Sequence, residues 1–136
     1  MNELNILIYC LIIACLLPYV AKVPLAYAMK KQGGGKLSGY DNKQPRLQQK
    51  QLTGFGARCL AAHENSFEAL ILFAPAVLLV IATSNINSYS TLLAISFICF
   101  RTIYLLCYWF NKDLLRSSFW ALAIISNIAL IVHCIN

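Results

Sequence analysis

The residues best suited to chemistry lie inside otherwise apolar stretches of this 136-residue chain. One stretch holds Arg58, Asn65 and Glu68, which fall within an arc of about 80° if the segment is a helix turning about 100° per residue. Glu64 flanks that arc, whereas His63 points away from it and is expected to pack or to lie at an interface. A cation, an amide and a carboxylate therefore share one helix face, although Arg58 could instead snorkel to lipid headgroups.

A second polar stripe occurs further along the chain. Arg101, Tyr104 and Tyr108 fall within about 60° on a helix, and Arg116 with Ser117 begins the next apolar stretch. An ionisable group at the centre of a membrane helix costs on the order of 2.5–3.5 kcal/mol and usually faces a bundle interior, a cavity or a partner. The two stripes therefore predict one polar site. Snorkelling of Arg116 and an aromatic belt of the two tyrosines are the alternatives.

This set of side chains suits a small zwitterion with more than one carboxylate. Arginines pair with carboxylates through two parallel hydrogen bonds, Glu68 can accept from an ammonium, and Asn65 can bond to peptide groups. Glutathione offers two carboxylates, one ammonium, two peptide bonds and a thiol, and therefore matches the set.

Chemistry at that thiol requires the thiolate, because the thiol is a poor nucleophile. Lowering the pKa of a thiol from about 8.5 to about 6.5 takes roughly 2.7 kcal/mol of differential stabilisation. A guanidinium in a water-poor pocket can supply this, and a hydroxyl donor can assist. Arg116 beside Ser117 is the candidate catalytic pair, because both stand at the start of a helix whose N-terminal dipole favours an anion.

The composition indicates that a membrane surrounds these residues. The chain is 60% hydrophobic and 12% charged, whereas a soluble domain is about 45–50% apolar and about 25% charged. A single soluble domain of this length could not bury so much apolar surface, which argues against a soluble enzyme, a disordered chain and a disulfide scaffold.

Four apolar stretches each approach the roughly 20 residues that a helix needs to cross the hydrocarbon core. They cover about residues 4–29, 57–83, 90–110 and 114–135, with a first connection over 30–56. The sequence predicts one all-α domain over residues 1–136, an integral membrane four-helix bundle.

The first stretch contains Pro18 and Pro24, which predict a kink or an early end of the helix. Ala26-Tyr27-Ala28 also resembles a signal-peptidase site. A retained helix is favoured, because residues 1–3 supply no positive charge and the apolar run exceeds a normal signal-peptide core.

The basic residues of the chain concentrate in the first connection. Six of the eleven lie between Lys30 and Lys50, with Asp41 as the one acid, so this segment has a net charge of +5. No basic helix or aromatic–basic module accompanies it, so we expect no nucleic-acid partner. Asp41-Asn42 favours a turn, within what is otherwise expected to be a solvated connector.

The distribution of charge also predicts an orientation. The third connection holds Lys112 and Arg116 against Asp113, and it must share a side of the membrane with the basic first connection. The positive-inside tendency places both in the cytoplasm and both termini outside.

The cysteines suggest neither a metal site nor a redox pair. They form no CxxC and no metal-ligand spacing, and are expected to be small buried apolar residues. They are Cys10, Cys15, Cys59, Cys99, Cys107 and Cys134.

The polar segments together resemble a known family. Residues 58–68 (RCLAAHENSFE) resemble the second helix of the MAPEG family, the membrane-associated proteins in eicosanoid and glutathione metabolism. Residues 101–117 resemble its third helix and the start of its fourth. Tyr40-Asp41-Asn42 with Pro45-Arg46 is similar to the first loop of bacterial members. The resemblance covers essentially the whole chain.

The resemblance implies a homotrimer of four-helix subunits, with glutathione bound between neighbouring subunits near the cytoplasmic side. The likeness of the first loop to bacterial members favours a bacterial cytoplasmic (inner) membrane, and the topology also fits the endoplasmic reticulum as the alternative. It also implies glutathione transfer, peroxidase or isomerase reactions on lipophilic substrates. Arg116 matches the family's thiolate-stabilising arginine. The glutathione site implied in this way comprises Asn65, Glu68, Arg101, Tyr104, Tyr108, Arg116 and Ser117.

Three positions depart from relatives in the family. Mammalian enzymes commonly have an arginine at the place of Ala61, whereas the nearest arginine here is Arg58. Glu64 stands where the prostaglandin E synthase branch has a basic residue, and Trp120 where that branch has a tyrosine. Clamping of the ligand's carboxylates is thus expected to differ from that branch.

The leading hypothesis is a glutathione-dependent membrane transferase or peroxidase that acts on lipophilic electrophiles or lipid hydroperoxides. The alternative is a non-catalytic lipid-binding accessory protein, which the family also includes. A small proton-coupled exporter is a third class with four helices, but it typically needs an embedded acid in its first helix, and here that helix has Glu3 at its very end. The sequence does not identify the second substrate.

Overall fold

The computed structural model describes residues 2–33 and 39–135, and that part of the chain folds into five helices. Gly34, Gly35 and Lys36 of the basic connection lie outside the described residues. Four helices are long and apolar enough to cross a membrane, which confirms the all-helical fold with four apolar helices. The long helices are α1 (Glu3–Gln32), α3 (Gly54–Ala82), α4 (Ser88–Trp109) and α5 (Asp113–Val132), and the short α2 is Pro45–Lys50.

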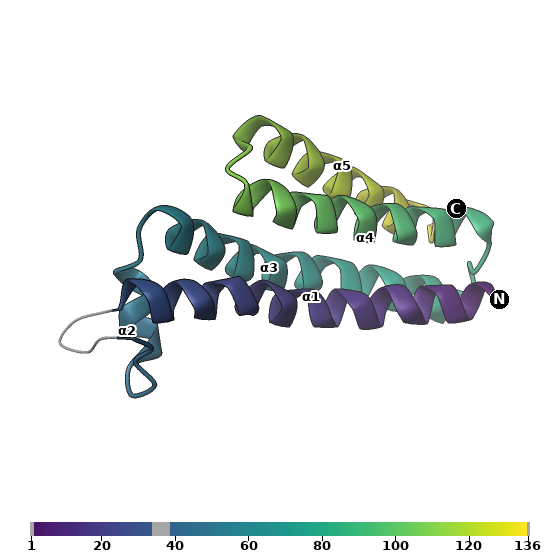
Figure 1. Ribbon diagram of the computed structural model, residues 1–136. Coiled ribbons are helices and arrows are strands. Elements are labelled where there is room, and N and C mark those ends of the chain that lie inside the picture. The colour runs from purple at the N-terminus through teal and green to yellow at the C-terminus, as the bar shows by residue number, and fades with distance from the viewer. Residues whose placement is uncertain (1, 34–38, 136) are drawn as a thin grey trace.

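The long helices form two packed pairs. Helix α1 lies along α3, and α4 lies along α5; contacts of α4 with α1 and α3 join the pairs (Figure 1). Successive long helices run in opposite directions, so the two termini lie at the same end of the bundle (Figure 1). This arrangement brings the faces of α3, α4 and α5 that carry polar residues toward one another.

Helix α1 continues without a break through Pro18 and Pro24 and ends at Gln32, so neither proline ends it early. Each proline removes one backbone N–H, a loss that membrane helices tolerate when neighbouring helices supply packing. Leu25 and Met29, in the last turns of α1, are fully buried. The segment after the prolines is therefore an integral part of the bundle.

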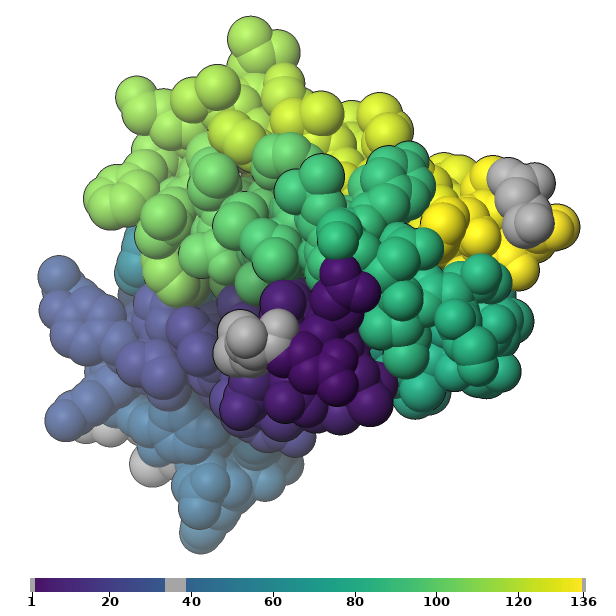
Figure 2. All heavy atoms as spheres, turned by 90° about the vertical axis from the view of Figure 1, so that its right-hand side faces the viewer, coloured from purple at the N-terminus to yellow at the C-terminus, as the bar shows by residue number. Residues whose placement is uncertain are grey.

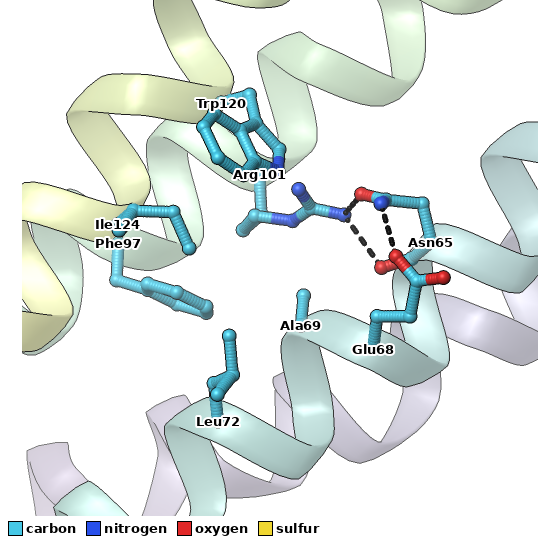
Figure 3. Close-up of a pocket in the computed structure, with 8 residues that line it drawn as sticks. All are labelled: Asn65, Glu68, Ala69, Leu72, Phe97, Arg101, Trp120 and Ile124. Carbon is cyan, nitrogen blue, oxygen red and sulfur yellow. Dashed lines mark hydrogen bonds between the residues drawn. The ribbon is translucent and has the colours of Figure 1, made fainter.

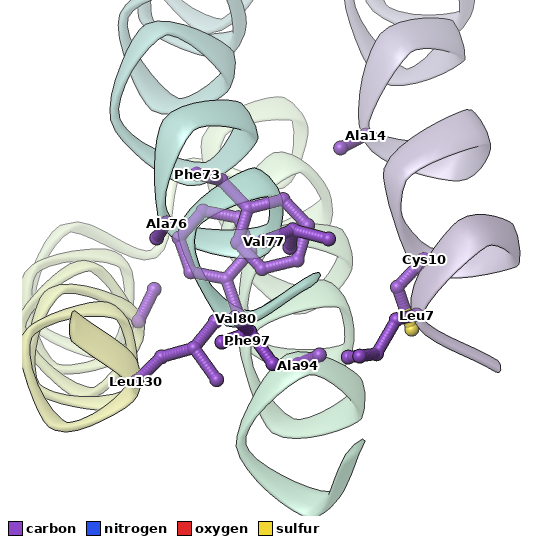
Figure 4. Packing of buried hydrophobic residues seen from close by; sticks show 11 residues of the cluster. Leu7, Cys10, Ala14, Phe73, Ala76, Val77, Val80, Ala94, Phe97 and Leu130 are labelled. Atoms are coloured by element: carbon purple, nitrogen blue, oxygen red, sulfur yellow. The ribbon is translucent and has the colours of Figure 1, made fainter. Parts of the chain in front are cut away.

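The core is built from close helix contacts around one aromatic pair. Phe73 of α3 and Phe97 of α4 stack with ring centroids 4.2 Å apart and planes 3° from parallel (Figure 4). Small residues matter here because lipid provides no hydrophobic drive between helices, and alanines let backbones approach closely. Buried alanines from all four long helices include Ala14, Ala21, Ala62, Ala76, Ala94 and Ala123.

The outer face of the bundle is largely apolar. Exposed side chains on the long helices include Val23, Ile71, Leu92 and Ile125, as expected of a surface in contact with lipid. Figure 2 looks onto the end that carries the start of α1, which lies against the region where α4 begins. At that end the Ser88 hydroxyl donates to a carboxylate oxygen of Glu3 over 2.6 Å.

Caps at both ends of α4 fix the position of its polar residues. Before α4, the Asn87 side chain accepts from the backbone N–H of Ser90, and the Ser90 hydroxyl accepts from the N–H of Asn87, both over 3.0 Å. After α4, Asn111 takes a left-handed conformation (φ 56°), and the N–H of Lys112 donates to the Cys107 carbonyl over 2.8 Å. The turn then leads directly into α5, which begins at Asp113.

From Gly39 onward, the described part of the first connection folds against the end of α1 and is more than a solvated connector. Gln48 of α2 is 2% exposed, and its amide donates to the carbonyls of Met29 and Gly39 and accepts from the N–H of Asp41. Asp41 makes the turn that the sequence predicts, since its carboxylate accepts from the N–H groups of the two residues after Asn42, Lys43 and Gln44.

Candidate functional site

Arg101 is the centre of the polar cluster. It lies in the middle of α4, and its side chain is 3% exposed. Its Nη2 donates to two oxygens of Asn65 on α3, the side-chain Oδ1 over 2.8 Å and the backbone carbonyl over 3.0 Å (Figure 3). A buried cation without hydrogen-bond partners is very costly. The two bonds to Asn65 therefore hold the middle of α4 against α3.

The amide of Asn65 connects the cation to an acid. Its Oδ1 accepts from Arg101, and its Nδ2 donates to Oε2 of Glu68, one turn along α3 (Figure 3). The cation fixes which way the amide faces, because only the oxygen can accept from a guanidinium. Glu68 itself is exposed, so its second carboxylate oxygen remains open to a partner from outside the chain.

Two tyrosines extend the cluster from Arg101 toward α5. The guanidinium of Arg101 lies 4.2 Å from the ring centroid of Tyr104, and that of Arg116 lies 4.5 Å from the centroid of Tyr108. The two rings meet edge to face at 5.2 Å. Each cation thus rests on the negative face of an aromatic ring, and the four side chains form one continuous series from α4 to α5.

Arg116 and Ser117 lie in the first turns of α5, as the sequence predicts. Arg116 is half-buried, whereas Ser117 is exposed, and the Ser117 hydroxyl donates to the backbone carbonyl of Asp113 over 3.1 Å. A serine hydroxyl has one hydrogen to donate. Ser117 must therefore rotate away from this bond before it can assist an anion beside Arg116.

A cavity of about 90 Å³ lies between α3, α4 and α5 beside this cluster (Figure 3). Arg101, with Asn65 and Glu68, forms its polar side. Nη2 of Arg101 makes both bonds to Asn65, which leaves the N–H groups of Nε and Nη1 for other acceptors. The remaining lining residues are Ala69, Leu72, Phe97, Trp120 and Ile124.

Most of this lining carries no distinctive signal in the sequence. Leu72, Phe97 and Ile124 are apolar residues in apolar helices, and only tertiary packing selects them from their neighbours. Trp120 is the exception, because its place one turn after Arg116 puts it on the same side of α5.

Arg58 lies apart from the others. Its guanidinium carbon is 6.0 Å from the ring centroid of Phe55, and its Nε is buried without a hydrogen-bond partner among the described residues. Seven residues separate it from Asn65, about 10 Å along the helix axis. Within the described part of the chain, no hydrogen bond joins Arg58 to the cluster around Arg101.

His63 packs away from the cluster, in agreement with its helical angle. The side chain is 8% exposed, and Nδ1 lies 2.8 Å from the carbonyl oxygen of Pro18 on α1. Its ring also meets that of Phe67 edge to face at 5.3 Å. His63 therefore joins α3 to α1 on the side opposite to the polar stripe.

The fold and this site define a class: an integral membrane protein with four apolar helices and, between them, a cluster of cations, phenols, an amide and a carboxylate that is centred on the buried Arg101. The profile of the MAPEG family matches residues 6–136, nearly the whole chain. The chain belongs to the MAPEG family. The searches of curated proteins and of solved structures found no match to the chain.

Proposed function

We propose that this protein is a glutathione-dependent membrane transferase or peroxidase that acts on lipophilic electrophiles or lipid hydroperoxides. The observation that carries the proposal is the connected series of Glu68, Asn65, Arg101, the two tyrosines and Arg116 inside an apolar bundle. Membership of the family supports a role in glutathione or eicosanoid metabolism.

The donor set fits the ligand. Free N–H groups of Arg101 would bind a carboxylate, the open oxygen of Glu68 would accept from the ammonium, and Arg116 would face the sulfur. The thiolate of bound glutathione would attack an electrophilic carbon, forming a C–S bond as a leaving group departs or as a conjugated double bond takes up a proton. With a hydroperoxide it would attack the terminal oxygen and break the O–O bond, which gives an alcohol and a glutathione sulfenic acid that a second glutathione converts to the disulfide and water. The binding residues in this proposal are Arg58, Asn65, Glu68, Arg101, Tyr104 and Tyr108, and the catalytic residues are Arg116 and Ser117.

Arg116 would stabilise the thiolate for three physical reasons. It is half-buried among apolar helices, where a charge acts with less screening than in water. It stands at the N-terminal end of α5, where the helix dipole also favours an anion. Its guanidinium is held on the ring of Tyr108, so its position is set before the ligand arrives.

The size of the cavity supports a site shared between subunits. Ligand pockets usually measure about 300–1,000 Å³, whereas the space beside Arg101 is about 90 Å³ within one chain. Exposed Glu68 and Trp120 border that space, and both would be covered by a neighbouring copy. We therefore propose a homotrimer in which a second subunit completes the glutathione site, with Arg58 reaching the ligand from one of the copies.

The proposed setting is a bacterial cytoplasmic (inner) membrane. The first and third connections would face the cytoplasm because both are net basic, and both termini would lie outside. The Arg116 end of the site then opens toward the compartment in which glutathione is abundant.

The test is the ultraviolet difference absorbance of the thiolate when glutathione is added to detergent-purified protein. The proposal expects a saturable signal, reduced about tenfold in R116A. The roughly 2.7 kcal/mol needed for activation corresponds to about a hundredfold change in the ionisation constant of the thiol, and at about pH 7.4 this changes the fraction present as thiolate by about tenfold. The control is K112Q, which removes an exposed positive charge from the same turn and should keep the signal. A signal equal in R116A and the wild type would contradict the proposed role of Arg116.

Two observations favour the accessory lipid-binding alternative. Asn65 of the same chain already occupies Nη2 of Arg101, and position 61 carries no arginine that could clamp a second carboxylate. A folded wild-type protein that gives no thiolate signal and no glutathione conjugate, but retains lipid, would establish this alternative.

A further inference from the structure

A separate feature of the molecule lies on the outer face of α1, away from the polar cluster. An apolar groove of about 570 Å³ runs between the second half of α1 and the end of α4. Next to it is a second hollow of about 370 Å³. The first is lined by Val20, Val23, Pro24, Tyr27 and Trp109, and the second by Tyr27, Lys30 and Lys31.

The two hollows form one surface because they share Tyr27. On a helix that turns about 100° per residue, the α1 residues of both hollows fall within an arc of about 120°. Val20, Val23 and Tyr27 are each at least half exposed, so the groove is open to the surroundings of the bundle. Lys22 points about 140° away from Tyr27 around the helix axis and lies outside the surface.

The length of this surface matches one leaflet of a bilayer. From Val20 to Lys31 the helix rises about 16 Å, and the hydrocarbon core of a bilayer is about 30 Å thick. The surface is apolar over the first part of this length and ends in two exposed lysines at the end of α1. A molecule with an apolar tail and an anionic head, lying parallel to the helix, has this distribution.

The lining of the groove includes Trp109, whose indole N–H lacks a hydrogen-bond partner among the described residues. Trp109 is the last residue of α4, and its Nε1 is buried. Buried tryptophan N–H groups usually find an acceptor. An ester or phosphate oxygen of a lipid lying in the groove is an acceptor of suitable chemistry at this depth.

We propose that this surface binds an anionic phospholipid, with an acyl chain in the groove between α1 and α4 and the phosphate against Lys30 and Lys31. Charge complementarity selects an anionic rather than a zwitterionic lipid, because two lysines and no described acid line the head end. The proposal is independent of glutathione, since none of these residues belongs to the polar cluster.

The experiment uses the fluorescence of Trp109 in nanodiscs. The chain has two tryptophans, so W120F leaves Trp109 as the reporter. Phosphatidylglycerol or phosphatidylcholine with brominated acyl chains is titrated at constant total lipid and constant net surface charge, with unlabelled lipid making up the balance. We expect the anionic probe to quench Trp109 at a lower mole fraction than the zwitterionic probe.

The matched variants are K30Q/K31Q and K43Q/K50Q in the W120F background. Both remove two positive charges from the same end of the molecule, but Lys43 and Lys50 line neither hollow. Each lysine at an anionic surface contributes about fivefold to affinity, so K30Q/K31Q should lower the preference between about fivefold and twenty-fivefold, and K43Q/K50Q should leave it unchanged. Helix content by circular dichroism shows that each variant is folded.

Equal quenching by the two lipids in folded W120F protein would overturn the proposal. An equal loss of preference in both double variants would also overturn it, because it would indicate attraction to the whole basic end rather than to this surface.

Discussion

Replacing Asn65 with leucine tests whether the cluster exists for binding rather than for stability. In N65L, Arg101 loses the 2.8 Å bond to Oδ1 and keeps the 3.0 Å bond to the backbone carbonyl, while the arginine is expected to stay buried as it is in the wild type. A hydrogen bond to a charged group contributes about 1.5–3 kcal/mol. N65L should therefore lower the free energy of unfolding by about 1.5–3 kcal/mol.

The partner substitution has a different expected cost. R101M removes the buried charge together with its need for acceptors, and it leaves no uncompensated charge behind, because its partner Asn65 is neutral and half-buried. We expect R101M to cost about 1 kcal/mol or less, and the double variant N65L/R101M to lie within about 1 kcal/mol of the wild type. The double-mutant cycle should then give a coupling of about 1.5–3 kcal/mol.

The assay follows helix content by circular dichroism in mixed micelles as the fraction of denaturing detergent rises, with thiolate absorbance measured on each folded variant. The double variant should be folded but give no glutathione signal. Additive losses in the cycle would refute the reasoning, because they would show that the guanidinium does not depend on the amide. A normal glutathione signal in the folded double variant would refute the binding role of the pair.

Substitutions at three further positions give distinct outcomes. Y108F keeps the ring on which Arg116 rests and should retain most of the thiolate signal, whereas Y108L should reduce it severalfold; equal signals would show that the ring does not position the arginine. S117A should reduce the signal by about fivefold or less, since its hydroxyl must first leave the Asp113 carbonyl at a cost of about 1 kcal/mol. Q48A should cost about 1–3 kcal/mol and speed proteolysis near Gly39, because three hydrogen bonds of a buried amide are lost; an unchanged digestion rate would count against this role.

The helices and the polar stripes could be predicted from sequence because a membrane restricts the possibilities. Apolar runs of about 20 residues have few other uses, and ionisable groups within them are rare enough to be informative. The stripes on residues 58–68 and 101–108 therefore indicated Asn65 and Arg101 as neighbours, and the structure bonds them directly.

Helical angle alone does not place a residue along the axis, and this limits what the pattern can say about Arg58. Its angle matches that of Asn65, but it lies about 10 Å nearer the start of α3, where its guanidinium meets Phe55. The angular position was informative, and the depth at which α4 crosses α3 was not available from the sequence.

The hydrogen bonds of Gln48 in the first connection could also not be predicted from the sequence pattern. Gln48 is one polar residue among many in a basic segment, and only the fold shows that its amide is buried and bonded to three backbone groups. Tertiary packing determines that Gln48 has this role, because the last turn of α1 brings the Met29 carbonyl against α2.

Asn65 and Asn127 each make a hydrogen bond between two long helices, but only Asn65 belongs to the candidate site. Lipid provides no hydrophobic force between helices, so side-chain hydrogen bonds are among the contacts that hold α4 and α5 to α3. Asn127 of α5 donates to the Leu72 carbonyl over 3.2 Å and is 4% exposed, with no described titratable group bonded to it. Asn65 makes the corresponding join to α4 but carries a cation on one side and an acid on the other.

The difference matters because the contact between α3 and α4 uses only one of the three guanidinium nitrogens of Arg101. Nη2 of Arg101 makes both bonds that hold the helices together, neither bond uses Nε or Nη1, and Arg101 lines the cavity. A ligand that takes those remaining groups does not have to break the contact between α3 and α4, so binding adds to the stability of the bundle instead of competing with it. In the proposed site the same charge would dock two helices and bind a carboxylate through charge-assisted hydrogen bonds, whereas Asn127 has one remaining amide N–H and no charge to offer an anion.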